Sequence, residues 1–142
     1  MKYLLDTNVV SELRKAGTGR ADPSVTSWAA SVDPAALYIS VITVMELEIG
    51  ILRVERRDSA QGVLLRNWLE HQVIPAFVGR LLPIDVAVAR RCARMLVPDP
   101  KADRDAFIAA TAAAHGLTVV TRNTADFQAT GAVLLDPWSY GP

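Results

Sequence analysis

The stretch MKYLLDTNVVSE, residues 1–12, contains a short apolar run over residues 3–5 that stops abruptly at Asp6. A short, bounded apolar run is typical of a buried β-strand. Asp6, Thr7 and Asn8 are residue types that begin helices, and apolar residues follow them. We therefore expect Asp6 where a buried strand passes into a helix, at the sheet edge where open α/β proteins bind ligands. The same pattern also fits an Asp6 that only caps the helix.

The composition limits the classes of protein to which the chain can belong. Its 142 residues, 51% of them hydrophobic, suggest a single domain over residues 1–142 with a proper core. Lys+Arg and Asp+Glu both number 15, so a uniformly basic, nonspecific nucleic-acid-binding surface is not expected. The single cysteine, Cys92, excludes an internal disulfide and fits a cytoplasmic protein. Neither a signal peptide nor an apolar span of about 20 residues is present, so no membrane association is expected.

Short strands and helices alternate along the chain. Strand patterns follow the first strand at residues 37–41, 81–85, 117–121 and 133–135. The longer helical patterns cover residues 44–57, 60–77, 86–96 and 103–115, and Pro75 is expected to bend or end the second of them. Such alternation predicts an α/β sandwich around a mostly parallel sheet.

Four polar residues lie next to strands of this predicted sheet. Asp6 and Asn123 directly follow strands, Glu46 lies one turn into the helix after the second strand, and Asp105 begins the helix before residues 117–121. Because the ends of parallel strands share one edge, at least three of these side chains are expected to converge. Oxygen ligands without His or Cys favour Mg²⁺ or Mn²⁺, which can activate water for attack on phosphorus.

Each of these acids also has a purely structural interpretation. Glu46 is compatible with a solvated helix position, and Asp103 and Asp105 are compatible with acids that complement a helix dipole. The coincidence of their placement favours a site over three unrelated structural roles.

Four segments resemble the PIN-domain ribonucleases, in particular the VapC-type and FitB-like toxins of toxin–antitoxin pairs. They cover residues 4–8, 44–47, 105–112 and 120–127, in order along nearly the whole chain. The resemblance implies a three-layer α/β/α sandwich around the mostly parallel sheet. It also implies a Mg²⁺-dependent endoribonuclease that cleaves transfer or ribosomal RNA.

The same resemblance assigns roles to individual residues. Asp6 and Asp105 bind the metal, Mg²⁺ or Mn²⁺, and Glu46 completes the acidic set. Many members carry an acid where this chain has Asn123, so we expect one well-held Mg²⁺ and an Asn123 that orients a water or a neighbouring carboxylate. Asp126 competes for the place of a fourth acid, but it is interpreted as the cap of the short turn before residue 127.

The resemblance further implies a cognate VapB-like antitoxin, a homodimer, an RNA substrate, and contact with DNA only through the antitoxin. We expect exposed tryptophans to serve an interface: Trp28, Trp68 and Trp138. We also expect basic residues to hold RNA phosphates. These are Arg14, Lys15, Arg53, Arg90, Arg94, Lys101 and Arg122.

Other functions fit the sequence less well. A metal-dependent phosphatase of the haloacid-dehalogenase type needs a second aspartate two positions after the first, where this chain has Asn8. A dinucleotide-binding module needs a Gly-rich first turn, which is missing. The main alternative without catalysis is a binding module of a regulatory protein–DNA complex, in which the acids are structural.

Overall fold

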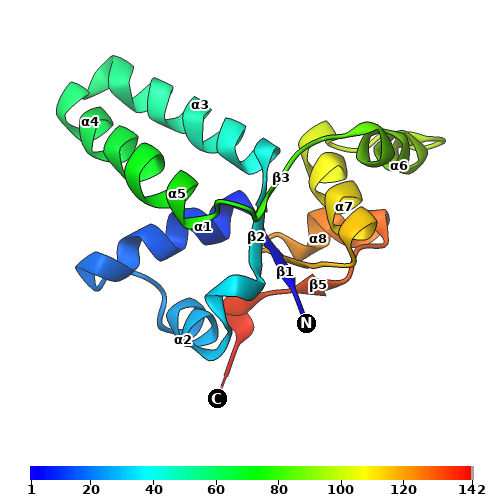
Figure 1. The fold of residues 1–142 in the computed structure, drawn as a ribbon, viewed down its shortest axis with the longest axis horizontal. Helices are drawn as coiled ribbons and strands as arrows, with labels where there is room; N and C mark the ends of the chain where they lie inside the picture. Colours follow the sequence, from blue (N-terminus) through cyan, green and yellow to red (C-terminus); the bar gives the residue numbers. More distant parts are fainter. Residues whose placement is uncertain (142) are drawn as a thin grey trace.

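A strand of three residues lies at the centre of the sheet. The computed structural model describes residues 1–141, and in it β1, Tyr3–Leu5, is the middle of a parallel sheet with the order β3-β2-β1-β4-β5 (Figure 1). Tyr3 pairs with Leu37 on one side and with Thr118 on the other. The other strands are β2 Leu37–Ser40, β3 Leu81–Leu82, β4 Thr118–Val120 and β5 Leu134–Leu135.

Helices connect these strands and cover both faces of the sheet. Their bounds are α1 Thr7–Arg14, α2 Pro23–Ser31, α3 Val41–Arg57, α4 Ser59–Trp68, α5 Ile74–Ala76, α6 Val86–Leu96, α7 Asp103–His115 and α8 Thr124–Phe127. Short 3-10 turns include η4, Gln128–Thr130, directly after α8. None of the helices in residues 1–141 combines the length and the apolar character that crossing a membrane requires.

The alternation of side chains along β1 divides the core into two parts. Successive residues of a strand point to opposite faces, and Leu4 and Leu5 are both almost completely buried. Leu5 packs with residues of α1, α2 and α3, whereas Leu4 packs with Ile108 of α7 and Phe127 of α8. Helices α1–α5 therefore cover one face and α6–α8 the other (Figure 1), which confirms the predicted three-layer sandwich.

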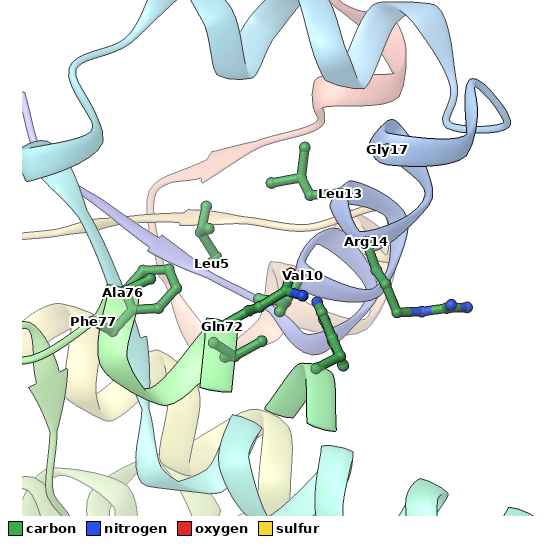
Figure 2. A pocket seen from close by; sticks show the side chains of 10 residues that line it. Leu5, Val10, Leu13, Arg14, Gly17, Gln72, Ala76 and Phe77 are labelled. Atoms are coloured by element: carbon green, nitrogen blue, oxygen red, sulfur yellow. The ribbon is translucent and has the colours of Figure 1, made fainter. Parts of the chain in front are cut away.

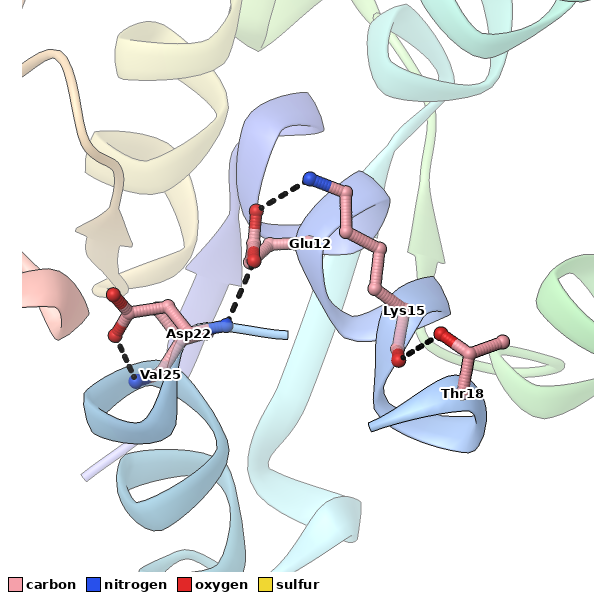
Figure 3. A network of polar contacts seen from close by, with 5 residues as sticks. All are labelled: Glu12, Lys15, Thr18, Asp22 and Val25. Atoms are coloured by element: carbon pink, nitrogen blue, oxygen red, sulfur yellow. Dashed lines mark hydrogen bonds and ion pairs between the residues drawn. The ribbon is translucent and has the colours of Figure 1, made fainter. Parts of the chain in front are cut away.

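A polar network joins the end of α1 to the start of α2 (Figure 3). Glu12 accepts hydrogen bonds from the Asp22 backbone N–H at 2.8 Å and from Lys15 Nζ at 3.2 Å. Asp22 in turn accepts from the Val25 backbone N–H at 3.2 Å and so caps α2. These bonds, first of all that from Asp22, lower the pKa of Glu12.

Several element boundaries differ from the predicted ones: the strand predicted over residues 81–85 already ends at Leu82, and two helices begin earlier than expected. Helix α3 begins at Val41 rather than at residue 44, because the Ser40 side chain accepts from the Ile42 backbone N–H at 3.0 Å and starts the helix at the end of β2. The helix predicted over residues 60–77 begins at Ser59, with α4, and contains a π-helical stretch, Leu69–Val73, before Pro75. Proline has no N–H to donate to the preceding turn, and here the π-helical stretch comes shortly before it. The helix continues through Pro75 and ends one residue later, at Ala76.

Candidate functional site

Asp6 is the buried acid at the carboxyl edge of the sheet, directly after β1. Its backbone N–H donates to the Val120 carbonyl oxygen at 2.9 Å. Its carboxylate accepts from the Thr7 backbone N–H and from the Thr121 hydroxyl, both at 2.8 Å. The residue is only 6% exposed, and this burial raises the pKa of Asp6 in spite of the hydrogen bonds that favour its charged form. Asp6 thus caps α1. It is also a buried carboxylate whose negative charge its neighbours do not fully stabilise.

Hydrogen bonds around Asp6 join the ends of β1 and β4. Thr121 Oγ1 donates to Asp6 and accepts from the Asn123 backbone N–H at 3.0 Å. Asn8 Nδ2 donates to Asp6 at 3.3 Å, and Asn8 Oδ1 accepts from the Arg122 backbone N–H at 3.2 Å. Thr121 is absent from the site predicted from the sequence. The signal that points to it is a polar residue directly after a strand that neighbours β1.

Glu46 reaches the same edge of the sheet from α3. The Thr7 hydroxyl donates to Glu46 Oε1 at 2.6 Å. The other carboxylate oxygen, Oε2, lies 3.6 Å from a guanidinium nitrogen of Arg104 in α7. The negative charge of Glu46 contributes to the raised pKa of Asp6. The structure therefore brings Glu46 to Asp6 and adds Thr7 and Arg104, which the sequence did not indicate.

Asp105 lies in the first turn of α7 and completes a group of interacting carboxylates. The pKa of Asp105 is raised to about 6, first by burial and then by three neighbouring acids. In order of their effect these are Asp6, Asp126 and Glu46. Carboxylates that raise the pKa of one another lie close enough to repel. Acids from four separate segments therefore meet at one edge of the sheet.

The structure corrects the interpretation of Asp126. Asn123 occupies the N-cap position of α8, without a side-chain capping bond, and Asp126 lies inside the first turn, where its backbone N–H donates to the Asn123 carbonyl oxygen at 3.1 Å. The interpretation of Asp126 as a cap is wrong, because α8 begins two residues before it. The Asn123 backbone is tied to the strand end, and the Asp126 charge acts on Asp105.

A family model described as PIN domain matches residues 3–133 of the chain. The chain belongs to the PIN-domain family. VapC ribonuclease Y4jK of Sinorhizobium fredii is 39% identical to this PIN domain over 140 residues, which are 95% of this chain and 96% of that protein. Toxin FitB of Neisseria gonorrhoeae is 38% identical over 141 residues, which are 95% of this chain and 97% of FitB.

Comparison with solved structures agrees with this assignment. FitAcB from Neisseria gonorrhoeae superposes with a TM-score of 0.85 at 36% identity, covering 96% of this chain and 99% of that chain. The predicted PIN-domain membership, with relatives among the VapC and FitB proteins, and the predicted α/β fold are confirmed.

The oxygen atoms of this PIN domain fit a hard divalent cation. Asp6 and Asp105 both have raised pKa values, so a cation shared by them would relieve their repulsion. Within residues 1–141, no three Asp, Glu, His or Cys side chains form a ready-made metal site. Mg²⁺ suits such an open arrangement because it keeps several waters and binds through one or two carboxylates.

Three of the predicted phosphate-binding residues contact aromatic or acidic side chains of the PIN domain. The Arg14 guanidinium lies 5.9 Å from the centre of the Trp68 ring, and that of Arg122 lies 5.1 Å from the centre of the Trp138 ring. Lys15 pairs with a glutamate of α1 (Figure 3). The remaining members of the predicted set, on α3, on α6 and in the loop before α7, are Arg53, Arg90, Arg94 and Lys101.

The prediction of exposed tryptophans is wrong for Trp28. Its side chain is 2% exposed and packs edge-on against Tyr3, with the ring centres 5.3 Å apart. The reason is that α2 turns its apolar face towards the sheet, so its largest side chain fills the core. Trp68 and Trp138 are half-buried beneath the arginines that lie over them.

An apolar groove of about 290 Å³ opens between α1 and the segment that ends in α5 (Figure 2). Its walls include Val10, Leu13, Trp68, Val73 and Phe77. Arg14 and Gln72 add polar groups to an otherwise hydrophobic lining. The groove is therefore a surface for apolar groups and differs in character from the acidic edge of the sheet.

Proposed function

We propose that this PIN domain is a Mg²⁺-dependent endoribonuclease. The observation that carries the proposal is the convergence of Asp6, Glu46 and Asp105 on one edge of the sheet. Relatives named VapC ribonuclease and toxin FitB, 38–39% identical over nearly the whole chain, support it. Mg²⁺ or Mn²⁺, held by Asp6 and Asp105 with Glu46 completing the set, would activate a water and neutralise charge on the phosphate.

Residues around the acids prepare the site for this reaction. Thr7 and Thr121 hold the Asp6 carboxylate in one orientation, and the Thr7 hydroxyl also holds Glu46. Arg104 brings a positive charge to Glu46, where it can attract the phosphate of a bound RNA. The expected substrate is transfer or ribosomal RNA.

The fourth group of the site is either Asn123 or Asp126. Asn123 stands at the end of β4, with its backbone bound to the threonine that orients Asp6, and would orient a water or a carboxylate. Asp126 adds a negative charge close to Asp105. A charged fourth group strengthens the attraction for a cation, whereas an amide leaves one well-held Mg²⁺ as the expected state.

We also propose that the protein is the toxin of a type II toxin–antitoxin pair and forms a homodimer in the cytoplasm. Its relative FitB is named a toxin, and a ribonuclease that attacks cellular RNA has to be neutralised in its own cell. A VapB-like antitoxin is the expected partner, and the apolar groove beside α1 offers a surface for its hydrophobic side chains. Contact with DNA is expected only through that antitoxin.

Induction of the protein without its partner, followed by sequencing of RNA ends, tests the proposed function. The unmutated protein should arrest growth and create new ends at defined positions, whereas Asp105→Ala should do neither. In vitro, cleavage by the purified protein should require Mg²⁺ and stop with a chelator. A folded unmutated protein that creates no new ends would favour a non-catalytic binding module, and cleavage that survives chelation would exclude the metal mechanism.

A further inference from the structure

A basic hollow of about 400 Å³ lies beside α6, separate from the acidic site. One wall carries Arg91 and Arg94 of α6 together with Lys101 of the next loop, and the other wall carries Ala129 and Thr130 of η4. Arg91 and Arg94 are three residues apart on the helix and therefore share a face. None of the described residues that line the hollow is acidic. Three positive charges thus face one concave surface without a carboxylate to neutralise them.

The cations of the basic hollow keep hydrogen-bond donors free for a ligand. Arg91 and Arg94 are exposed and form no ion pair within residues 1–141. Each guanidinium presents five N–H donors in a planar fork that matches a phosphate. Lys101 Nζ donates to the Met95 and Asp99 carbonyl oxygens at 2.6 and 3.2 Å, which fixes its charge at the wall. An ammonium has three donors, so one remains for a ligand.

The basic hollow and the acids lie close together in the fold. The segment of residues 123–130 begins at the acidic site and ends at the hollow, because η4 follows α8 directly. Thr130 lies only four residues after Asp126, at the end of η4. On the other wall, α6 packs along α7 through Cys92 and Ala106, and α7 carries Asp105 in its first turn. Helices α6, α7 and α8 all lie on one side of the sheet (Figure 1).

We propose that the basic hollow binds a backbone phosphate of the RNA outside the nucleotide that is cleaved. The inference rests on the proposed ribonuclease function and adds a second contact with its substrate. The acids repel an approaching phosphate, and the chain has a formal net charge of zero, so the strand needs a local cluster of cations for attraction. Phosphate contacts fix the position of a strand rather than read its bases. The hollow therefore sets the register of the strand at the acids and adds no sequence preference.

RNA binding by two matched double variants tests this proposal. Both are made in the Asp105→Asn background, which prevents cleavage, and a fluorescent single-stranded RNA is followed by anisotropy over a series of salt concentrations. Arg91→Ala with Arg94→Ala removes two charges from the hollow. The control, Arg56→Ala with Arg57→Ala, removes the same charge from the last turn of α3, outside the hollow.

The hollow variant should bind the RNA about tenfold more weakly, as expected when one charge-assisted hydrogen bond is removed. Its salt dependence should also fall, by about 0.7 in the slope of log K against log salt for each phosphate that the variant no longer binds. The control variant should keep the slope and affinity of the Asp105→Asn parent. Equal affinities and slopes for the two double variants would overturn the proposal.

Two further measurements separate this proposal from others. If the unmutated protein cleaves RNA, the hollow variant in that background should raise KM about tenfold and leave kcat unchanged. If it does not cleave, the proposed function fails, but the binding assay still decides whether the hollow holds RNA phosphates. Unchanged RNA binding with weakened antitoxin binding would assign the hollow to the protein partner and overturn the proposal. Glutamine replacements of the same arginines serve if the alanine variant unfolds.

Discussion

The α3–α4 hairpin and the edge of the sheet both gather acids, but only the hairpin neutralises them. Arg66 lies 2.5 Å from Glu48, 2.9 Å from Glu55 and 4.0 Å from Glu70. The hydrogen bonds with Glu55 and then Glu48 raise the pKa of Arg66 above its usual value. Gly62 allows this close approach of the two helices, because a Cβ there would lie 2.5 Å from Glu55 Cγ. The acids of the hairpin are therefore part of the packing of two helices.

The acids at the sheet edge are arranged in the opposite way. The single cation paired with them within the described residues, Arg104, is half-exposed and lies 3.6 Å from Glu46 alone. Asp6 and Asp105 keep raised pKa values, which means that the fold holds their charges together without full compensation. Such an arrangement is typical of a functional site, where the missing positive charge comes from a ligand. Neutralisation of the acids by neighbouring cations, rather than the number of acids, therefore distinguishes a structural cluster from a reactive one.

The largest expected difference between the two clusters is in RNA cleavage. Asp6→Asn keeps the shape of the side chain but removes its charge, and we expect cleavage to fall by roughly a hundredfold or more because the metal loses a ligand. Glu55→Gln makes the same chemical change on the hairpin and should leave the rate unchanged. Initial rates with saturating Mg²⁺ provide the measurement. Similar rates for the two variants would show that the sheet-edge acids are no more important for cleavage than those of the hairpin.

Mg²⁺ should stabilise the fold through the sheet-edge acids and not through the hairpin. A cation that binds only the folded site at a hundred times its dissociation constant adds about 2.7 kcal/mol to the free energy of unfolding. Thermal melts with and without Mg²⁺ should show this gain for the unmutated protein and for Glu55→Gln, but not for Asp6→Asn. A midpoint that Mg²⁺ leaves unchanged in the unmutated protein would contradict the metal site.

The fourth group of the site can be identified from a pair of variants. Asp126→Asn removes one of the charges that act on Asp105, so we expect a lower pKa of Asp105 and a loss of cleavage of about tenfold. Asn123→Ala removes no charge and should have the smaller effect on both. NMR titration of the metal-free protein and cleavage rates at several Mg²⁺ concentrations provide the measurements. A larger loss of cleavage in Asn123→Ala than in Asp126→Asn would identify Asn123 as the fourth group of the site.

The metal-free protein should lose stability as the pH rises from about 4 to above 6. The pKa of Asp105 is about 6 in the folded chain and 3.8 without the fold, so the folded state holds a proton that the unfolded state has released. The stability that this bound proton adds to the folded state is fully present below pH 4 and is lost as the pH rises past 6. Because Asp105 is partly exposed, the change should be on the order of 1 kcal/mol. Urea unfolding in chelator at pH 4 and pH 7 measures it, and Asp105→Asn should reduce the pH dependence.

The smallest effects are expected from the two arginines. Arg66→Ala leaves three glutamates of the hairpin without their partner and should slightly lower the unfolding midpoint, because ion pairs in contact with solvent contribute little, and these are partly exposed. Arg104→Ala removes a cation that competes for Glu46, so it should strengthen Mg²⁺ binding, measured by calorimetry. Weaker Mg²⁺ binding in Arg104→Ala would show that Arg104 does not compete with the metal.

Local sequence was sufficient for most of the fold. An apolar run that ends at Asp6 predicts a strand followed by a helix, and Gly116 predicts the end of α7, because capping depends on residues adjacent in the chain. The start of α3 and the π-helical stretch before Pro75 were not predicted. The accommodation of proline inside a helix is local as well, but the apolar pattern does not reveal it.

By itself, the sequence determined the α/β architecture, the PIN-domain resemblance and the placement of Asp6, Glu46 and Asp105 near strand ends. Only the tertiary structure decided which groups touch them. Thr7 is 39 residues from Glu46 along the chain, and Thr121 is 115 residues from Asp6. Such contacts depend on how strands and helices pack, and the same packing compensates the acids of one cluster and leaves those of the other exposed to mutual repulsion. Charge compensation is a property of distances in space, and local sequence does not encode those distances.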